Sequence, residues 1–165
     1  MPRKELDPGN EEECLSRGLS FLSYRPRTAR ETRQRAKRWG FSPGTVEGVV
    51  DRLIESGLID DERFAQAYME EMLAKGLGER TIRVRMLQKG LDRELVAAVL
   101  EAYPAELDGE RALQAARKRF RAVEEPGPAD MRRISEFLMR RGFPGSTARS
   151  VARAMADVDS DFWRE

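Results

Sequence analysis

The chain has 165 residues, a net charge of +1 from 30 Lys and Arg against 29 Asp and Glu, and no histidine. The lack of histidine removes the commonest general base and the commonest metal ligand. A single cysteine, Cys14, excludes an internal disulfide and a cysteine zinc site, and we interpret Cys14 as a small packing residue. No apolar run approaches the roughly 20 residues that span a bilayer, so we expect a cytoplasmic protein without membrane contact.

Apolar residues recur at helical spacing throughout, and no sustained strand alternation interrupts them, which predicts an all-α fold. The first expected helix carries Leu15, Leu19 and Leu22 on one face. The second runs from Thr28 to about Arg38, and the third runs from Pro43 to Ser56, with Gly57 as a left-handed cap. The fourth expected helix begins at Asp60-Asp61, and the fifth extends from Glu79 to Lys89. The sixth begins at Asp92 and ends before Pro104. The seventh expected helix begins at Asp108, the eighth runs from Met131 through Leu138, and the ninth begins at Pro144.

A short pattern occurs three times along the chain: basic residues, a glycine, one apolar residue, a loop and an amphipathic run. Its glycines are Gly40, Gly90 and Gly142, separated by 50 and 52 residues, and we interpret each as a helix C-cap. A fixed period of this size indicates tandem structural repeats. We therefore predict three three-helix repeats in an elongated or curved array. The expected boundaries are a flexible N-terminal segment at 1–10, repeats at 11–57, 58–106 and 107–157, and a C-terminal tail at 158–165.

Basic residues concentrate on the middle helix of each repeat, whereas the helices around Glu47, Asp51 and Glu94 are acidic. Between Arg25 and Arg38, only Glu31 opposes seven basic residues along the sequence. Like charges at this density repel one another, which favours an anionic partner over simple solvation. The candidate binding residues form a predicted basic stripe: Arg25, Arg27, Arg30, Arg33, Arg35, Lys37, Arg38, Arg80, Arg83, Arg85, Lys89, Arg132, Arg133, Arg140 and Arg141.

No catalytic constellation, glycine-rich phosphate loop or nucleophile elbow is present in the sequence. The acidic triplet Asp60-Asp61-Glu62 is dense enough to suggest Mg²⁺, but its position at a helix start favours capping. We therefore predict no enzyme, no metal and no cofactor. Trp39 ends a helix whose apolar face is otherwise small, so it fits the core and a partner contact equally well.

Three segments resemble the RecX family of bacterial recombinase regulators. They are Leu58–Tyr68, Gly78–Leu91 and the shorter Phe137–Phe143, and the resemblance extends from about Leu15 to Met155. Family members usually place leucines on the second helix, where this chain has Thr32 and Ala36. The resemblance implies three-helix repeats, no catalytic residues, and binding to the RecA filament on single-stranded DNA.

Such proteins lie in the filament groove and curb ATP hydrolysis, strand exchange and coprotease activity of RecA, in DNA repair and the SOS response. We expect this chain to act as a monomer, with direct DNA contact as one option. Two other functions remain open from the sequence. One is a sequence-specific DNA-binding regulator with a basic helix in the major groove, and the other is a helical scaffold for a different protein.

Overall fold

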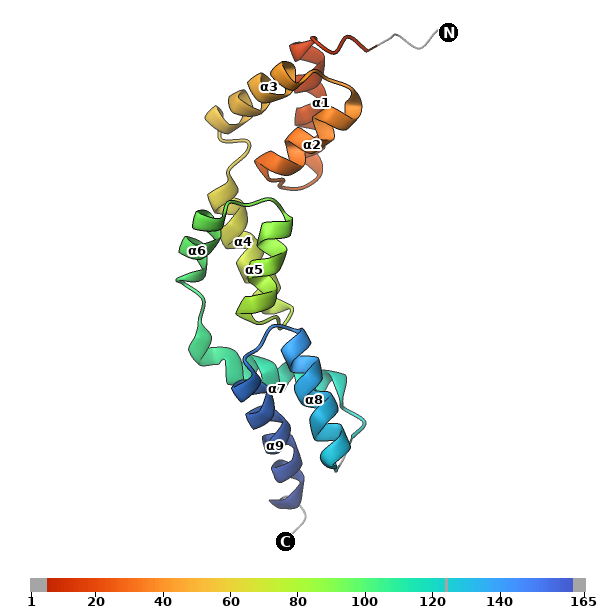
Figure 1. Ribbon diagram of the computed structural model, residues 1–165, viewed down its shortest axis with the longest axis vertical. Helices are drawn as coiled ribbons and strands as arrows, with labels where there is room; N and C mark the ends of the chain where they lie inside the picture. Colours follow the sequence, from red (N-terminus) through yellow and green to blue (C-terminus); the bar gives the residue numbers. More distant parts are fainter. Residues whose placement is uncertain (1–5, 124, 162–165) are drawn as a thin grey trace, which may run out of the picture. The chain divides into compact units, whose positions relative to one another are not determined.

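The computed structural model describes residues 6–123 and 125–161, and Figure 1 shows that this part of the chain is built from helices. Its nine α-helices are α1 (Glu11–Tyr24), α2 (Ala29–Trp39), α3 (Pro43–Glu55), α4 (Asp61–Ala74), α5 (Glu79–Gln88), α6 (Arg93–Leu100), α7 (Asp108–Arg119), α8 (Pro128–Arg140) and α9 (Gly145–Asp161). A short 3₁₀ helix, η1 (Ala105–Leu107), precedes α7. No strand occurs among the described residues, which confirms the all-α prediction.

Local sequence signals set most helix ends. The Asn10 side chain accepts from the Glu13 backbone N–H at 2.9 Å and caps α1, whereas Thr28 forms a capping box with Glu31 at the start of α2. The repeat glycines all have positive φ angles and end their helices as predicted: Gly40 at 100°, Gly90 at 84° and Gly142 at 96°. The capping interpretation of these glycines is therefore confirmed.

Two segments differ in detail from the sequence-based expectation. The last helix begins at Gly145, and Pro144 stands before it with its carbonyl accepting from the Ala148 N–H at 2.9 Å. The segment 1–10 was expected to be flexible, but Leu6 packs against the core and the Pro8 carbonyl accepts from the Ser42 N–H at 2.8 Å. Residues 1–5 and the C-terminal Phe162-Trp163 lie outside the described residues.

Contacts divide the described chain into two compact units. The first comprises residues 6–67 and 86–96. Its core is the apolar face of α3, where Val46, Val50 and Leu53 are almost completely buried. Cys14 of α1 is buried in the same cluster, as expected for a packing residue, and burial raises the pKa of its thiol. The buried face of α2 consists of the small residues Ala29, Thr32 and Ala36.

The second unit comprises residues 68–85 and 97–161. Its main core joins α7, α8 and α9 through Ile134, Leu138, Phe143, Ala148 and Ala112, all fully or almost fully buried. The hydroxyl of buried Tyr103 donates to the carboxylate of Asp108 at the start of α7, and Arg111 donates to the same carboxylate at 2.7 Å. This network fixes the beginning of the third predicted repeat.

Within the first unit, the N-terminus of α2 meets the last turn of α5. The Thr28 hydroxyl donates to the Lys89 carbonyl at 2.8 Å, and the Ala29 N–H donates to the Asp61 carboxylate at 2.9 Å. A Cβ placed on Gly90 would lie 2.1 Å from Cδ of Arg30, so only glycine permits this approach without movement. Asp61 of the second predicted repeat thus caps a helix of the first.

Within the second unit, the N-terminus of α5 meets the last turn of α8 in a corresponding way. The Gly78 N–H donates to the Arg141 carbonyl at 2.9 Å, and a Cβ on Gly142 would lie 2.5 Å from the Thr81 backbone nitrogen. In both units, therefore, the N-terminus of the middle helix of one predicted repeat lies against the C-terminus of the middle helix of the next repeat. This pairing sets the positive end of one helix dipole against the negative end of another.

Candidate partner-binding surface

The basic residues of α2 are partly neutralised by the neighbouring helix. Arg33 pairs with Glu47 at 2.6 Å and with Asp51 at 3.8 Å, and Lys37 lies 3.9 Å from Glu47. The sequence suggested that only Glu31 opposes the cluster, which holds along the chain but not in space. The acidic residues of α3 supply the missing counter-charges, so Arg33 and Lys37 are weaker candidates for a partner contact.

The Glu31 carboxylate forms ion pairs with two cations at the start of α2. It lies 3.1 Å from Lys89 and 3.6 Å from Arg25. Burial by itself would raise the pKa of Glu31, but hydrogen bonds from Lys89 and from the Thr28 backbone outweigh burial and lower it. Glu31 is therefore held ionised, and it fixes Lys89 in a structural role.

Arginines and aromatic rings of α1, of α2 and of the loop between them form an arginine–aromatic cluster, defined here as Phe21, Arg27, Arg35 and Trp39. The Arg27 guanidinium lies 4.2 Å from the Phe21 ring centroid, and Arg35 lies 5.7 Å from Phe21 and 5.5 Å from Trp39. Phe21 and Trp39 meet edge to face at 5.9 Å. Such stacking holds guanidinium groups as flat platforms at the protein surface.

Features in and beside this cluster oppose a purely structural role. Arg27 Nε is buried without a hydrogen-bond partner among the described residues, and Tyr24, three residues before Arg27, is 85% exposed. Burial, together with the positive charge of Arg25, lowers the pKa of Arg27. Of the two roles that the sequence left open for Trp39, the structure shows core packing, because Trp39 packs against the core from a half-buried position beside the arginines.

Phe21 and Tyr24 were not recognised from the sequence as candidates. The signal was present, because the two rings lie three residues apart on a helix and immediately precede Arg25 and Arg27.

The basic residues of α5 and α8 fall into different environments. Arg83 pairs with Glu79 at 2.7 Å, and the Arg85 guanidinium contacts the Met72 sulfur at 3.5 Å. On α8, Arg133 lies 3.5 Å from Asp130 and Arg140 lies 3.9 Å from Glu136. These exposed pairs within or near one turn contribute little stability.

Arg141 has a structural function. Its Nε donates to the Gly76 carbonyl at 2.9 Å, and Nη2 donates to the Lys75 carbonyl, so the guanidinium caps the end of α4. Burial and the neighbouring Arg85 lower its pKa.

Besides Arg85, which contacts Met72, five residues of the predicted stripe are exposed and form no salt bridge with any carboxylate of the described chain. We call them the unpaired arginines: Arg30, Arg35, Arg38, Arg80 and Arg132. They lie on α2, α5 and α8, and together they are the strongest part of the predicted stripe. Their side chains can bind carboxylates or phosphates without first breaking an ion pair.

Both aspartates of the Asp60-Asp61 motif are hydrogen-bonded to helix starts. The Asp60 carboxylate accepts from the Arg63 N–H at 2.9 Å and caps α4, whereas Asp61 caps α2. Across residues 6–123 and 125–161, no group of three His, Cys, Asp or Glu side chains is arranged to hold a metal. None of the described helices combines the length and apolar character that crossing a bilayer requires.

The fold and these surfaces define a protein of helical repeats that carries exposed arginines on its middle helices. Models of the first, second and third three-helix domains of RecX match residues 14–53, 60–100 and 106–151, respectively. The chain therefore belongs to the RecX family, as the sequence resemblance predicted.

Relatives and solved structures agree with this assignment. "Regulatory protein RecX" of Mycobacterium sp. (strain JLS) is 33% identical over 157 residues, which cover 91% of this chain and 85% of the relative. The protein of the same name from Halorhodospira halophila is 37% identical and covers 87% of this chain and 88% of its own length. A crystal structure of regulatory protein RecX has a TM-score of 0.76 and 26% identity over 93% of this chain and 81% of its own. The crystal structure of RecX from Lactobacillus salivarius gives the same TM-score at 21% identity, covering 90% of this chain and 97% of that one, and supports the fold.

Proposed function

We propose that this chain is a cytoplasmic regulator that binds the RecA filament on single-stranded DNA and inhibits its ATP hydrolysis, strand exchange and coprotease activity. The observation that carries the proposal is the match to all three RecX domains in order along the chain. The protein acts by binding, without catalysis of its own.

The arrangement of charges supports a multivalent mode of binding. Unpaired arginines occur on the middle helix of each predicted repeat, with Arg38 on α2, Arg80 on α5 and Arg132 on α8. Each exposed arginine contributes little alone, but contacts carried by one chain add through their high effective concentration. In this proposal a monomer contacts several filament subunits or phosphates at once.

The test is RecA-driven ATP hydrolysis on single-stranded DNA, measured against increasing concentrations of this protein. The parent lowers the rate, and it hydrolyses no ATP alone. The double variant Arg35→Gln, Arg38→Gln needs roughly tenfold more protein for half inhibition, because two charged contacts of about 0.7 kcal/mol each are lost. Glutamine preserves helix propensity.

The matched control is Arg63→Gln with Arg93→Gln, which removes the same charge from exposed positions of α4 and α6 outside the stripe. The control retains parental inhibition if the stripe is the binding surface. Equal losses in both variants would assign the effect to net charge. A parent that leaves RecA unaffected but binds one duplex operator tightly would replace this proposal with the DNA-binding regulator.

A further inference from the structure

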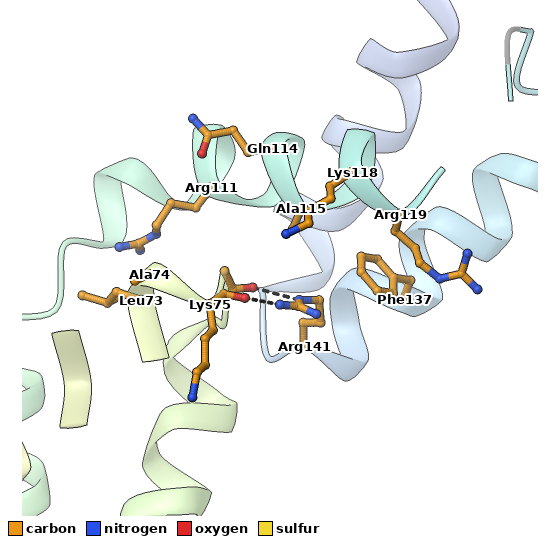
Figure 2. Close-up of a pocket in the computed structure, with 11 residues that line it drawn as sticks. Leu73, Ala74, Lys75, Arg111, Gln114, Ala115, Lys118, Arg119, Phe137 and Arg141 are labelled. Atoms are coloured by element: carbon orange, nitrogen blue, oxygen red, sulfur yellow. Dashed lines mark hydrogen bonds between the residues drawn. The ribbon is translucent and has the colours of Figure 1, made fainter. Parts of the chain in front are cut away.

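Three adjoining hollows in the second unit are lined by many cations and a single carboxylate residue, Glu136. The largest has a volume of about 710 Å³ and lies among the end of α4, α7 and α8 (Figure 2). A second, of about 240 Å³, shares Arg119 and Phe137 with it, and a third, of about 450 Å³, shares Glu136 and Arg140 with the second. Shared lining residues connect the three into one track that follows α8.

The charges along this track are strongly one-sided. Its cations are Lys75, Arg80, Arg111, Lys118, Arg119, Arg133, Arg140 and Arg141, and the carboxylate among the lining residues is that of Glu136. Four of these cations have carboxylate partners. Arg111 binds Asp108, and Lys75 lies 2.5 Å from Glu71. Arg133 lies 3.5 Å from Asp130, and Arg140 lies 3.9 Å from Glu136. Lys118 and Arg119 form no salt bridge with a carboxylate of the described chain.

Arg141 adds a charge that is held in place beneath the track. Its hydrogen bonds to the Lys75 and Gly76 carbonyls fix the guanidinium, and Figure 2 shows it below α7, on the opposite side of the hollow from Lys118. A bound anion would offset the cost of this partly buried charge, because no carboxylate of the described residues does so.

Phe137 supplies an apolar element at the point where the first two hollows meet. Its ring is half-buried, packs edge to face on Phe120 at 5.5 Å, and lies 5.3 Å from the Arg141 guanidinium. Arg111 and Arg119 stand eight residues apart on α7, which places their Cα atoms about 12 Å apart along the helix axis. An extended polyanion with flat apolar groups matches this combination of spaced cations and an aromatic ring.

We propose that this track binds a single strand of nucleic acid, with phosphates at Lys118, Arg119 and Arg141 and a base against Phe137. A single strand is favoured over a duplex because a duplex keeps its bases stacked away from such a ring. The proposal deepens the proposed function by assigning the DNA contact to a defined site. It is tested without RecA, so its failure leaves the RecA proposal standing.

The experiment is fluorescence anisotropy of a labelled oligothymidylate with the full chain, over a range of salt concentrations. The variant Lys118→Gln, Arg119→Gln is expected to bind roughly tenfold more weakly, with the log–log salt slope reduced by about 1.4 for two lost phosphate contacts. The matched control Arg117→Gln, Arg121→Gln removes equal charge from exposed residues that do not line the track, and it keeps the parental affinity and slope.

A third variant separates stacking from charge. Phe137→Leu should weaken binding by about fivefold or more and leave the salt slope unchanged, because no phosphate contact is lost. Thermal unfolding of each variant checks that the fold is retained. Equal effects of the two charge variants, or equal affinity for a duplex of the same sequence, would overturn the proposal. So would an acidic peptide whose binding depends on Lys118 and Arg119 while that of the oligonucleotide does not.

Discussion

Replacing Gly142 by alanine is expected to be unusually costly for a glycine at a helix end. Its φ angle of 96° is left-handed, which costs an alanine about 1 kcal/mol. The added Cβ would also lie 2.5 Å from the backbone nitrogen and 2.6 Å from the hydroxyl of Thr81. Backbone cannot rotate out of the way as a side chain can, so α5 and α8 must move apart.

The magnitude follows from comparison with Gly76 in the same unit. Gly76 has a φ angle of 67°, but its Cβ would meet Ala115 at an ordinary 3.4 Å. Gly76→Ala should therefore lower the free energy of unfolding by about 1 kcal/mol from backbone strain alone. Gly142→Ala should lower it by about 2–4 kcal/mol, because overpacking adds about 1–3 kcal/mol.

Urea unfolding of the two variants, followed by circular dichroism, measures this difference. The midpoint of Gly142→Ala should fall well below that of Gly76→Ala, with a similar dependence on urea. Equal midpoints would refute the reasoning, because they would show that α5 does not approach the Gly142 backbone closely in solution.

Three further predictions concern charge and shape. Glu31→Gln should make the free energy of unfolding fall less steeply than in the parent as the pH drops below about 4.3. The reason is that the pKa of Glu31 is lowered in the folded state, so its carboxylate stabilises the fold above its unfolded pKa and loses this contribution in acid. Parallel acid titrations of both proteins would contradict this. Burial raises the pKa of Asp61, so the charge of its carboxylate opposes folding at neutral pH. Asp61→Asn should match or exceed the parent in thermal stability, whereas Asp61→Ala should lose about 1 kcal/mol because the cap on α2 is lost. An Asp61→Ala variant more stable than Asp61→Asn would disprove the capping role. The tandem-repeat prediction gives a radius of gyration above the roughly 15 Å of a compact chain of this length, and small-angle scattering at that lower value would reject an elongated array.

Helix positions could be predicted from the sequence because their determinants are local. The repeat glycines and Asp60 act within one turn of their own positions, and the apolar spacing is visible over a dozen residues. η1 was missed, since a single turn after Pro104 carries too few residues to show a period. The hydrogen bond between Tyr103 and Asp108, which lie on either side of η1, is visible only once the chain is folded.

The candidate surface was harder to predict, because charge pairing depends on tertiary neighbours. Glu47 is 14 residues from Arg33, and only the packing of α3 on α2 brings their side chains together. The sequence treated all seven cations of Arg25–Arg38 alike, whereas the structure separates paired residues such as Arg33 from unpaired ones such as Arg38. The track beside Lys118 could not be found from the sequence, because α4, α7 and α8 each supply part of it.

The most direct test of the proposed function compares binding of this protein to bare and to RecA-coated single-stranded DNA of the same sequence. The strand is immobilised, RecA is held on it by a non-hydrolysable ATP analogue, and association is followed optically at physiological salt. We predict clearly tighter binding to the RecA-coated strand, because filament contacts add to any contact with DNA. Equal or weaker binding to the coated strand would contradict recognition of the filament.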